Sequence, residues 1–190
     1  MKNLDILIAD DEALIRVDIK KMLETVGHRI CAECGNGIQA VELAKQHRPN
    51  LAILDIKMPE LDGLEAAKIL YALNIPTVIV TAYSQPRFIS RAENVYVCGY
   101  LVKPIFQQNL LATVRIAYAR WGDLQHMRNE LKQTQDRLEQ QKMIAHAQAV
   151  LIDCWNVPAV KAYQQLVQES MRRRVTLFDL AKDVVSKGKL

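Results

Sequence analysis

The stretch LAILDIKMPELDGLEAAKILYALNIPTVIVTA, residues 51–82, contains the pattern that decides the fold. It begins with the apolar run LAILDI (51–56), continues through the helical pattern GLEAAKILYAL (63–73) and ends with the apolar run TVIVTA (77–82). Near-continuous apolar runs of this length are typical of strands that are buried on both faces of a parallel sheet. The stretch therefore predicts a strand–helix–strand unit whose two strands are parallel.

The same alternation extends in both directions from this unit. The chain has further apolar runs at 4–9, 28–34 and 98–103, and helical patterns at 13–27, 38–47, around 86–94 and at 106–121. Five strand–helix units with short connections predict an α/β fold, a doubly wound parallel sheet, over residues 1–121. Because only 6% of the residues are aromatic, we expect the core to be aliphatic.

The helical pattern continues beyond Trp121, where Gly122 alone interrupts it at a cost of about 1 kcal/mol relative to alanine. Small or apolar residues recur every seven positions, at Leu110, Ala117, Leu124, Leu131, Leu138 and Ala145. This spacing predicts a long helical coiled-coil linker over residues 122–141. The other positions of the seam are only partly apolar, namely Met127, Thr134 and Gln141. The alternative is a solvated helix whose leucine stripe packs on its own domain.

The last third of the chain contains three more helical patterns, at 142–152, 157–171 and 176–185. Helices this short are not stable alone, so we expect a small three-helix all-α domain over residues 142–190. A stripe on its first helix is expected to close the core, formed by Ala147, Val150, Leu151 and Cys154. We also expect three aromatic residues to lie in this core and not to stack on bases, namely Trp155, Tyr163 and Phe178.

Charge and cysteine usage narrow the class of protein. The net charge is +4 and most of the basic excess follows Trp121, which weakly favours a polyanionic partner. No run approaches the ~20 apolar residues of a membrane span. The first residues turn acidic too early for a signal peptide, so we expect a cytoplasmic protein without a membrane partner. Cys31 and Cys34 fall on opposite faces of a strand, which excludes a disulfide, and Cys98 and Cys154 are expected to be small buried residues.

Polar residues follow the predicted strands where each strand ends: Asp10, Asp11, Glu12, Asp55, Thr81 and Lys103. In an open parallel sheet these ends share one edge, where ligands bind. Carboxylates gathered there repel each other unless a cation holds them, and an all-oxygen site suits Mg²⁺. A carboxylate that faces Mg²⁺ and a lysine is a candidate nucleophile for phosphoryl transfer, which would form an acyl phosphate. The alternative is that acidic residues follow the strands only because strand ends are exposed to solvent.

Several separated motifs resemble the receiver domain of two-component response regulators: IADDE (8–12), LDIKMPELDG (54–63), TAY (81–83) and GYLVKP (99–104). The resemblance covers residues 1 to about 121 and implies a flavodoxin-like (βα)5 fold. It implies that Asp55 accepts a phosphoryl group from a sensor histidine kinase. It also implies that Mg²⁺ is bound by Asp11, Asp55 and the backbone carbonyl of Lys57, with Asp10 acting through water.

The same resemblance implies a switch. Thr81 would bond to a phosphoryl oxygen, Lys103 would pair with the phosphoryl group, and Tyr100 would rotate inward on activation. The peptide bond between Lys103 and Pro104 would be cis. The surface formed by the fourth helix, the fifth strand and the fifth helix would then change.

Residues 130–187 resemble the ANTAR output domain of transcription antiterminators that bind RNA. The matching positions are largely core positions: Ile144, Ala147, Leu151, Ala162, Leu166, Ser170, Leu177, Ala181 and Val185. This chain departs from the family at Gln148 and Ala149, where the family usually carries Lys-Gly, and a lost lysine removes a cationic contact. Candidate RNA-binding residues are Lys142, Gln148, Lys161, Arg172, Arg173, Arg174 and Lys182.

These patterns favour a phosphorylation-dependent response regulator, not an enzyme, which binds structured leader RNA as a transcription antiterminator. Phosphorylation would promote a homodimer through the fifth helix and the coiled coil. One alternative is a DNA-binding regulator with a helix-turn-helix output. Its recognition helix would begin with Leu177, Phe178 and Asp179, which suit base edges poorly. Another alternative is a protein-interaction output, which the residues at Gln148 and Ala149 leave open.

Overall fold

The computed structural model describes residues 3–82 and 97–188, and its N-terminal part is built on a five-stranded sheet. The strands are β1 (Asp5–Ala9), β2 (Arg29–Cys34), β3 (Leu51–Asp55), β4 (Thr77–Thr81) and β5 (Gly99–Val102). All neighbours pair in parallel, in the order β2-β1-β3-β4-β5. The chain thus adds strands first on one side of β1 and then on the other, which confirms the predicted doubly wound α/β fold.

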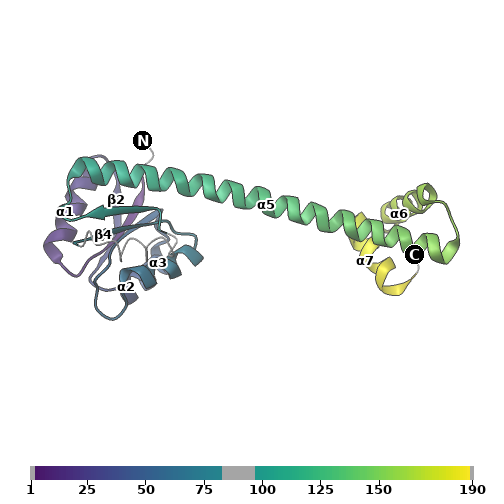
Figure 1. The fold of residues 1–190 in the computed structure, drawn as a ribbon, viewed down its shortest axis with the longest axis horizontal. Coiled ribbons are helices and arrows are strands. Elements are labelled where there is room, and N and C mark those ends of the chain that lie inside the picture. The colour runs from purple at the N-terminus through teal and green to yellow at the C-terminus, as the bar shows by residue number, and fades with distance from the viewer. Residues whose placement is uncertain (1–2, 83–96, 189–190) are drawn as a thin grey trace. The chain divides into compact units, whose positions relative to one another are not determined.

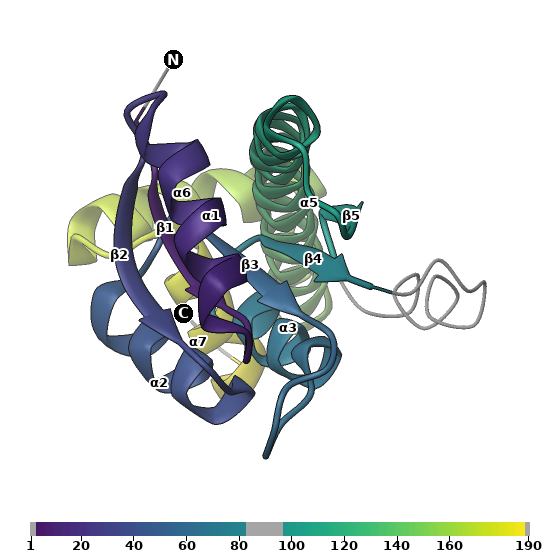
Figure 2. The same ribbon diagram turned by 90° about the vertical axis from the view of Figure 1, so that its left-hand side faces the viewer.

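Helices cover both faces of this sheet. They are α1 (Ala13–Glu24), α2 (Gly37–His47), α3 (Gly63–Ala72) and the first part of α5 (Gln107–Trp155). Successive strand residues point to opposite faces, so Ile6 contributes to the cluster under α1 and α5, whereas Leu7 contributes to the cluster under α2 and α3 (Figure 2). Both clusters are mainly aliphatic, as expected. The helix that we predicted around residues 86–94 lies outside the described residues.

α5 is one continuous helix of 49 residues (Figure 1). It contains the last helix predicted for the sheet domain, the predicted linker and the first helix predicted for the small domain, which is therefore not a separate element. Gly122 does not interrupt it, and a Cβ atom at this position would meet no atom within 4 Å. Just before this glycine, Trp121 packs edge-to-face on Tyr71 of α3, with 5.4 Å between ring centroids.

The chain divides into two compact units, Met1–Gln125 and His126–Leu190. In the second unit, α6 (Ala159–Arg173) and α7 (Leu177–Lys187) pack with the end of α5. The buried apolar residues of this three-helix core are Ala147, Leu151, Ala162, Leu166, Leu180, Ala181 and Val184. Thr176 caps α7, since its hydroxyl accepts a hydrogen bond from the Asp179 N–H at 3.1 Å.

For four residues of this unit, the prediction that they lie in the core is wrong. Cys154 is exposed, Trp155 and Tyr163 are 43% and 44% exposed, and Phe178 is partly exposed and lies outside the core cluster. For Tyr163 the reason is angular. The buried residues of α6 recur every four positions, at Ala162, Leu166 and Ser170, and Tyr163 lies beyond the edge of that stripe, about 60° from its centre. Among the other cysteines, Cys98 is only partly buried, and Cys31 and Cys34 are free thiols.

The predicted seam changes character along α5. Leu110 and Ala117 are buried in the first unit, whereas Leu124, Leu131 and Leu138 are 43%, 60% and 50% exposed. The alternative in which the whole stripe packs on its own domain therefore does not hold from Leu124 onward. Among the described residues, no helix is both long enough and apolar enough to cross a membrane.

Candidate phosphoryl-acceptor site and basic clusters

The loop after β3 holds Asp55 through backbone contacts. The Lys57 N–H donates to Asp55 Oδ2 at 2.7 Å, and Asp62 caps the start of α3 with its side chain. The Gly63 N–H donates to the Ile56 carbonyl at 3.0 Å. A Cβ atom on Gly63 would lie 1.9 Å from the backbone oxygen of Asp55, so only glycine fits this close approach.

Lys103, which follows β5, joins carboxylates from two other strand ends. Its Nζ lies 2.9 Å from Asp10 Oδ2, 3.2 Å from Asp55 Oδ1 and 3.2 Å from Glu12 Oε1. Asp10 and Asp55 are 1% and 5% exposed, so this charge pairing takes place out of bulk water. The peptide bond between Lys103 and Pro104 is cis, as the resemblance implied.

Burial and neighbouring charges set the protonation states of Asp55 and Lys103. Burial is the largest effect on Asp55 and raises the pKa of its carboxyl group, although the Lys103 charge opposes the change and the Asp10 charge adds to it. Burial alone would lower the pKa of Lys103, but hydrogen bonds and charges from Asp10 and Asp55 outweigh it and raise the pKa. Lys103 therefore remains a cation that can pair with an anionic group on Asp55.

The acidic residues after β1 add a second set of oxygen ligands. One carboxylate oxygen from each of Asp10, Asp11 and Glu12 lies within 4.8 Å of the others. A donor set made only of oxygen, next to the buried Asp55, fits the coordination chemistry of Mg²⁺. Glu12 was not among the predicted ligands, although the uninterrupted acidic run after β1 was a signal for it.

A pocket of 240 Å³ opens at this edge of the sheet and is lined by Asp11, Glu12, Asp55, Lys57, Thr81, Ala82 and Lys103. Thr81 is buried at the end of β4. Burial raises the pKa of Tyr100, and a side-chain hydrogen bond with Thr81 partly offsets the increase. The structure thus brings together all the residues predicted at the strand ends, and it places Tyr100 beside Thr81.

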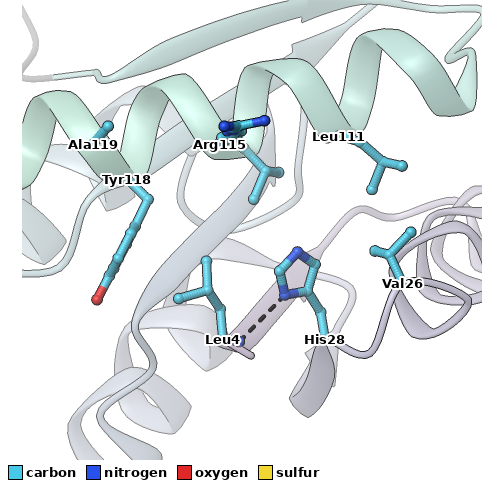
Figure 3. A pocket seen from close by; sticks show the side chains of 8 residues that line it. Leu4, Val26, His28, Leu111, Arg115, Tyr118 and Ala119 are labelled. Atoms are coloured by element: carbon cyan, nitrogen blue, oxygen red, sulfur yellow. Dashed lines mark hydrogen bonds between the residues drawn. The ribbon is translucent and has the colours of Figure 1, made fainter. Parts of the chain in front are cut away.

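A larger pocket, of 330 Å³, lies at the amino-terminal edge of the same sheet (Figure 3). It is lined by Leu4, Val26, His28, Leu111, Val114, Arg115, Tyr118 and Ala119. His28 Nδ1 accepts a hydrogen bond from the Leu4 N–H at 3.2 Å, and burial lowers the pKa of this histidine. The walls are almost entirely apolar, so this pocket offers no set of groups for phosphoryl chemistry, and sequence reasoning did not predict it.

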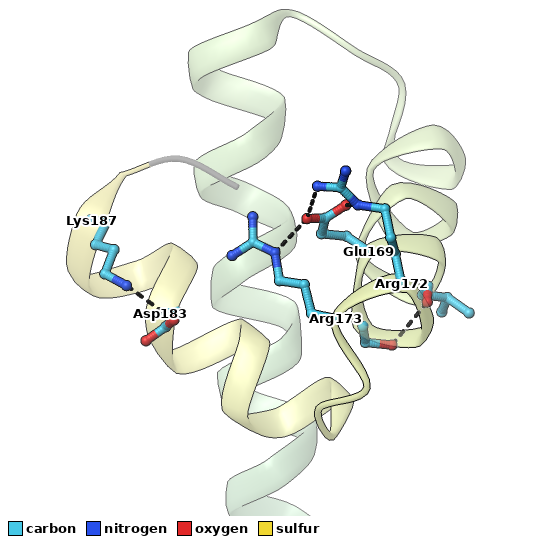
Figure 4. A network of polar contacts seen from close by, with 7 residues as sticks. Glu169, Arg172, Arg173, Asp183 and Lys187 are labelled. Atoms are coloured by element: carbon cyan, nitrogen blue, oxygen red, sulfur yellow. Dashed lines mark hydrogen bonds and ion pairs between the residues drawn. The ribbon is translucent and has the colours of Figure 1, made fainter.

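In the second unit, two of the predicted RNA-binding arginines are paired with an acid (Figure 4). Arg172 donates to both carboxylate oxygens of Glu169, at 2.8 and 2.7 Å, and Arg173 donates to the same carboxylate. These hydrogen bonds lower the pKa of Glu169 to about 2, and Arg172 has a larger effect than Arg173. Arg174 is exposed and ends α6 in a left-handed conformation, with φ of 56°.

The other predicted RNA-binding residues are spread over the second unit. Lys142 and Lys182 line one pocket between α5 and α7, and both are exposed. Lys161 is exposed on α6, and Gln148 is partly buried on α5. The seven residues therefore come from all three helices of the unit.

Comparison with known proteins identifies both parts of the chain. Residues 6–115 match the response regulator receiver domain, and residues 132–185 match the ANTAR domain. The chain is 36% identical over 181 residues to the transcriptional regulatory protein PdtaR of Mycobacterium tuberculosis. The alignment covers 95% of this chain and 88% of that protein. It is also 36% identical over 111 residues to the chemotaxis protein CheY of Bacillus subtilis, which covers 57% of this chain and 92% of CheY.

Solved structures agree with this assignment for the first unit. The receiver domain of a modulated diguanylate cyclase from Desulfovibrio desulfuricans matches with a TM-score of 0.60 and 30% identity, and covers 64% of this chain and 98% of that one. A DNA-binding response regulator of the LuxR family from Staphylococcus aureus matches with a TM-score of 0.58 and 30% identity, over 60% of this chain and 98% of that one. The chain therefore belongs to the response regulators in which a receiver domain is followed by an ANTAR domain, a family of regulators and not of enzymes.

Proposed function

We propose that this protein is a phosphorylation-controlled regulator that binds structured RNA and acts as a transcription antiterminator. The observation that carries the proposal is the site at Asp55, with Lys103 at 3.2 Å, on the same chain as an ANTAR domain. Its relative PdtaR is named a transcriptional regulatory protein. We assign residues 1–121 to the receiver, 122–141 to a coiled-coil linker and 142–190 to the RNA-binding domain of a cytoplasmic protein.

The phosphoryl donor would be a phosphohistidine of a sensor kinase. A carboxylate oxygen of Asp55 attacks the phosphorus, the new O–P bond forms as the P–N bond breaks, and the histidine nitrogen leaves with the electron pair. Lys103 remains charged because of Asp10 and Asp55, so it pairs with an oxygen of the arriving phosphoryl group. Thr81, which lines the same pocket, donates its hydroxyl to another phosphoryl oxygen.

Mg²⁺ would be held by Asp10, Asp11, Asp55 and the backbone carbonyl of Lys57, with Glu12 at the edge of the site. The bound cation would neutralise charge on the phosphoryl oxygens during transfer. The Lys57 N–H holds Asp55 Oδ2 at 2.7 Å. This hydrogen bond positions Asp55 Oδ1, which lies 3.2 Å from Lys103 Nζ, as the acceptor oxygen.

Phosphorylation would reach the output through α5. A phosphoryl group adds about −2 charge next to Thr81, which draws this side chain away from Tyr100 and releases the ring to repack. The exposed leucines of α5 would then pair with those of a second chain. Two linked RNA-binding domains would bind two RNA hairpins with a gain in avidity that comes from effective concentration.

Two measurements test this function. With Mg²⁺ and phosphoramidate, the protein is expected to gain the mass of one phosphoryl group, and the Asp55→Asn variant is expected to gain none. A pool of random structured RNA is expected to yield binding sequences that duplex DNA does not displace. Equal phosphorylation of the Asp55→Asn variant would reject the acceptor, and preference for duplex DNA would favour a DNA-binding output.

A further inference from the structure

Some basic side chains of the second unit form ion pairs and others do not. Glu169 compensates much of the charge of Arg172 and Arg173, at hydrogen-bond distance from both (Figure 4). Lys142 and Lys182 have no ion pair within the described part of the chain. Unlike the arginine pair, the two lysines therefore keep their amines out of direct ion pairs, where an anionic partner can contact them.

These lysines line a pocket of 390 Å³ between α5 and α7, together with Glu139, Met143, His146 and Phe178. Lys182 Nζ lies over the face of the Phe178 ring, 4.1 Å from its centroid, in a cation–π contact. Phe178 is partly exposed and does not belong to the three-helix core. An aromatic ring, a thioether wall and two amines thus meet in one concave site.

We propose that this pocket receives one unpaired base of a structured RNA, a site that rests on the proposed RNA-binding function and gives it a location. Phe178 is the platform on which the base stacks, because every base has a π face that an aromatic ring can cover. The base takes the place of the Lys182 amine over the ring, and the amine moves to a neighbouring phosphate. Lys142 and Lys182 pair with the phosphates on either side of that base.

Glu139 favours a base in this pocket over a phosphate group. Its carboxylate lines the same pocket and repels phosphate, but it accepts hydrogen bonds from the exocyclic amino group of a base. Bases in a continuous duplex are stacked in the helix interior and cannot reach Phe178. The site therefore selects loops and bulges over uninterrupted duplex RNA.

The test uses the full-length protein and RNA hairpins with randomised loops that were selected on it, together with loopless duplexes of the same stem. Phe178→Leu keeps an apolar side chain but removes the ring, and it is expected to weaken hairpin binding by roughly 5- to 100-fold. Phe178→Tyr restores the ring and is expected to restore binding. Tyr163→Leu removes an aromatic residue that is exposed outside the pocket, and it is expected to change nothing.

Crosslinking locates the base independently of affinity. Ultraviolet irradiation of the complex, followed by mass spectrometry, is expected to attach a loop nucleotide to the peptide that contains Phe178. Hairpin binding that is the same in Phe178→Leu and in the unaltered protein would overturn this site while leaving the RNA-binding function standing. Failure of the unaltered protein to bind any hairpin would overturn the function itself, and the site with it.

Discussion

Lys103 is the residue on which the geometry of the acceptor site depends. Its amine joins Asp10, which directly follows β1, to Asp55, which ends β3, and both carboxylates are buried. Without a cation between them, two buried carboxylates would repel each other, and one would take up a proton. The lysine therefore keeps the site assembled and also provides a partner for the phosphoryl group.

The raised pKa of Asp55 predicts how stability depends on pH. The ordinary value is 3.8, and burial raises it in the folded protein. The protonated form is favoured by folding, so its contribution to stability is complete below about 3.8 and is lost as the pH rises through the folded value. In Mg²⁺-free buffer, Asp55→Asn is expected to match the unaltered protein at low pH and to exceed it at neutral pH. Urea denaturation across this range checks the prediction, and a less stable variant at neutral pH would contradict it.

Two glycines are expected to respond to alanine in opposite directions. Gly63→Ala places a Cβ atom 1.9 Å from the backbone of Asp55 and is expected to lower the free energy of unfolding by at least ~1–3 kcal/mol. Gly122→Ala meets no atom within 4 Å inside α5 and is expected to raise it by about 0.5–1 kcal/mol. Chemical denaturation of both variants measures the difference. Equal effects at the two positions would show that the approach of Gly63 to Asp55 is not as close as described.

At the scale of elements, α5 belongs to both units and is the element through which they can be coupled. Residues such as Leu110 fix its first part on the sheet, and Ala147 and Leu151 are buried in the three-helix core. Between these anchors, the leucine stripe is exposed. An apolar stripe with a seven-residue period on a helix gains most when it packs against a second helix of the same kind.

Removing this stripe is expected to abolish association without unfolding the receiver. Each leucine lost from both chains of a dimer removes about 3 kcal/mol of burial, or roughly 100-fold in affinity. The double variant Leu131→Glu with Leu138→Glu is therefore expected to remain monomeric when it is activated, with an unchanged melting temperature. Gln133→Glu adds a charge to the same exposed segment of α5 and serves as the control. Light scattering measures the mass, and a dimer of the double variant would exclude this seam.

Glu169 on α6 is expected to limit the affinity of the protein for polyanions. Glu169→Gln would leave Arg172 and Arg173 without their acidic partner, so RNA binding is expected to tighten. The slope of log affinity against log salt is expected to steepen by roughly 1 to 2, because two more cations can meet phosphates. Asp183→Asn, which breaks only the pair with Lys187, is the matched control. A salt dependence that both variants share with the unaltered protein would show that the arginines lie outside the RNA interface.

The sequence predicted the sheet and its site better than it predicted the small domain. Buried parallel strands are nearly all apolar, so β3 and β4 were clear, and topology then required Asp55, Thr81 and Lys103 to meet at one edge. The second unit has short amphipathic helices, on which a shift of one residue along the chain moves a side chain from the buried face to the exposed face. Tyr163 and Cys154 therefore lie outside the core, although both are next to residues expected within it.

Side-chain pairing was beyond what the sequence could show. Nothing in the run from Glu169 to Arg174 distinguishes arginines that face solvent from arginines that pair within their own helix. The pairing with Glu169 depends on rotamers and on the spacing of three and four residues along α6. The same limit applies to Phe178, whose exposure follows from how α7 packs on α5.

Occupation of Asp55 is expected to control the binding of RNA. The most direct measurement is a titration of an RNA that carries two copies of a selected hairpin with the full-length protein, in Mg²⁺, with and without beryllofluoride, alongside the Asp55→Asn variant. Beryllofluoride is expected to tighten binding by at least 10-fold in the unaltered protein, through avidity of the dimer, and to leave the variant unchanged. Equal affinity of the unaltered protein with and without beryllofluoride would contradict the claim.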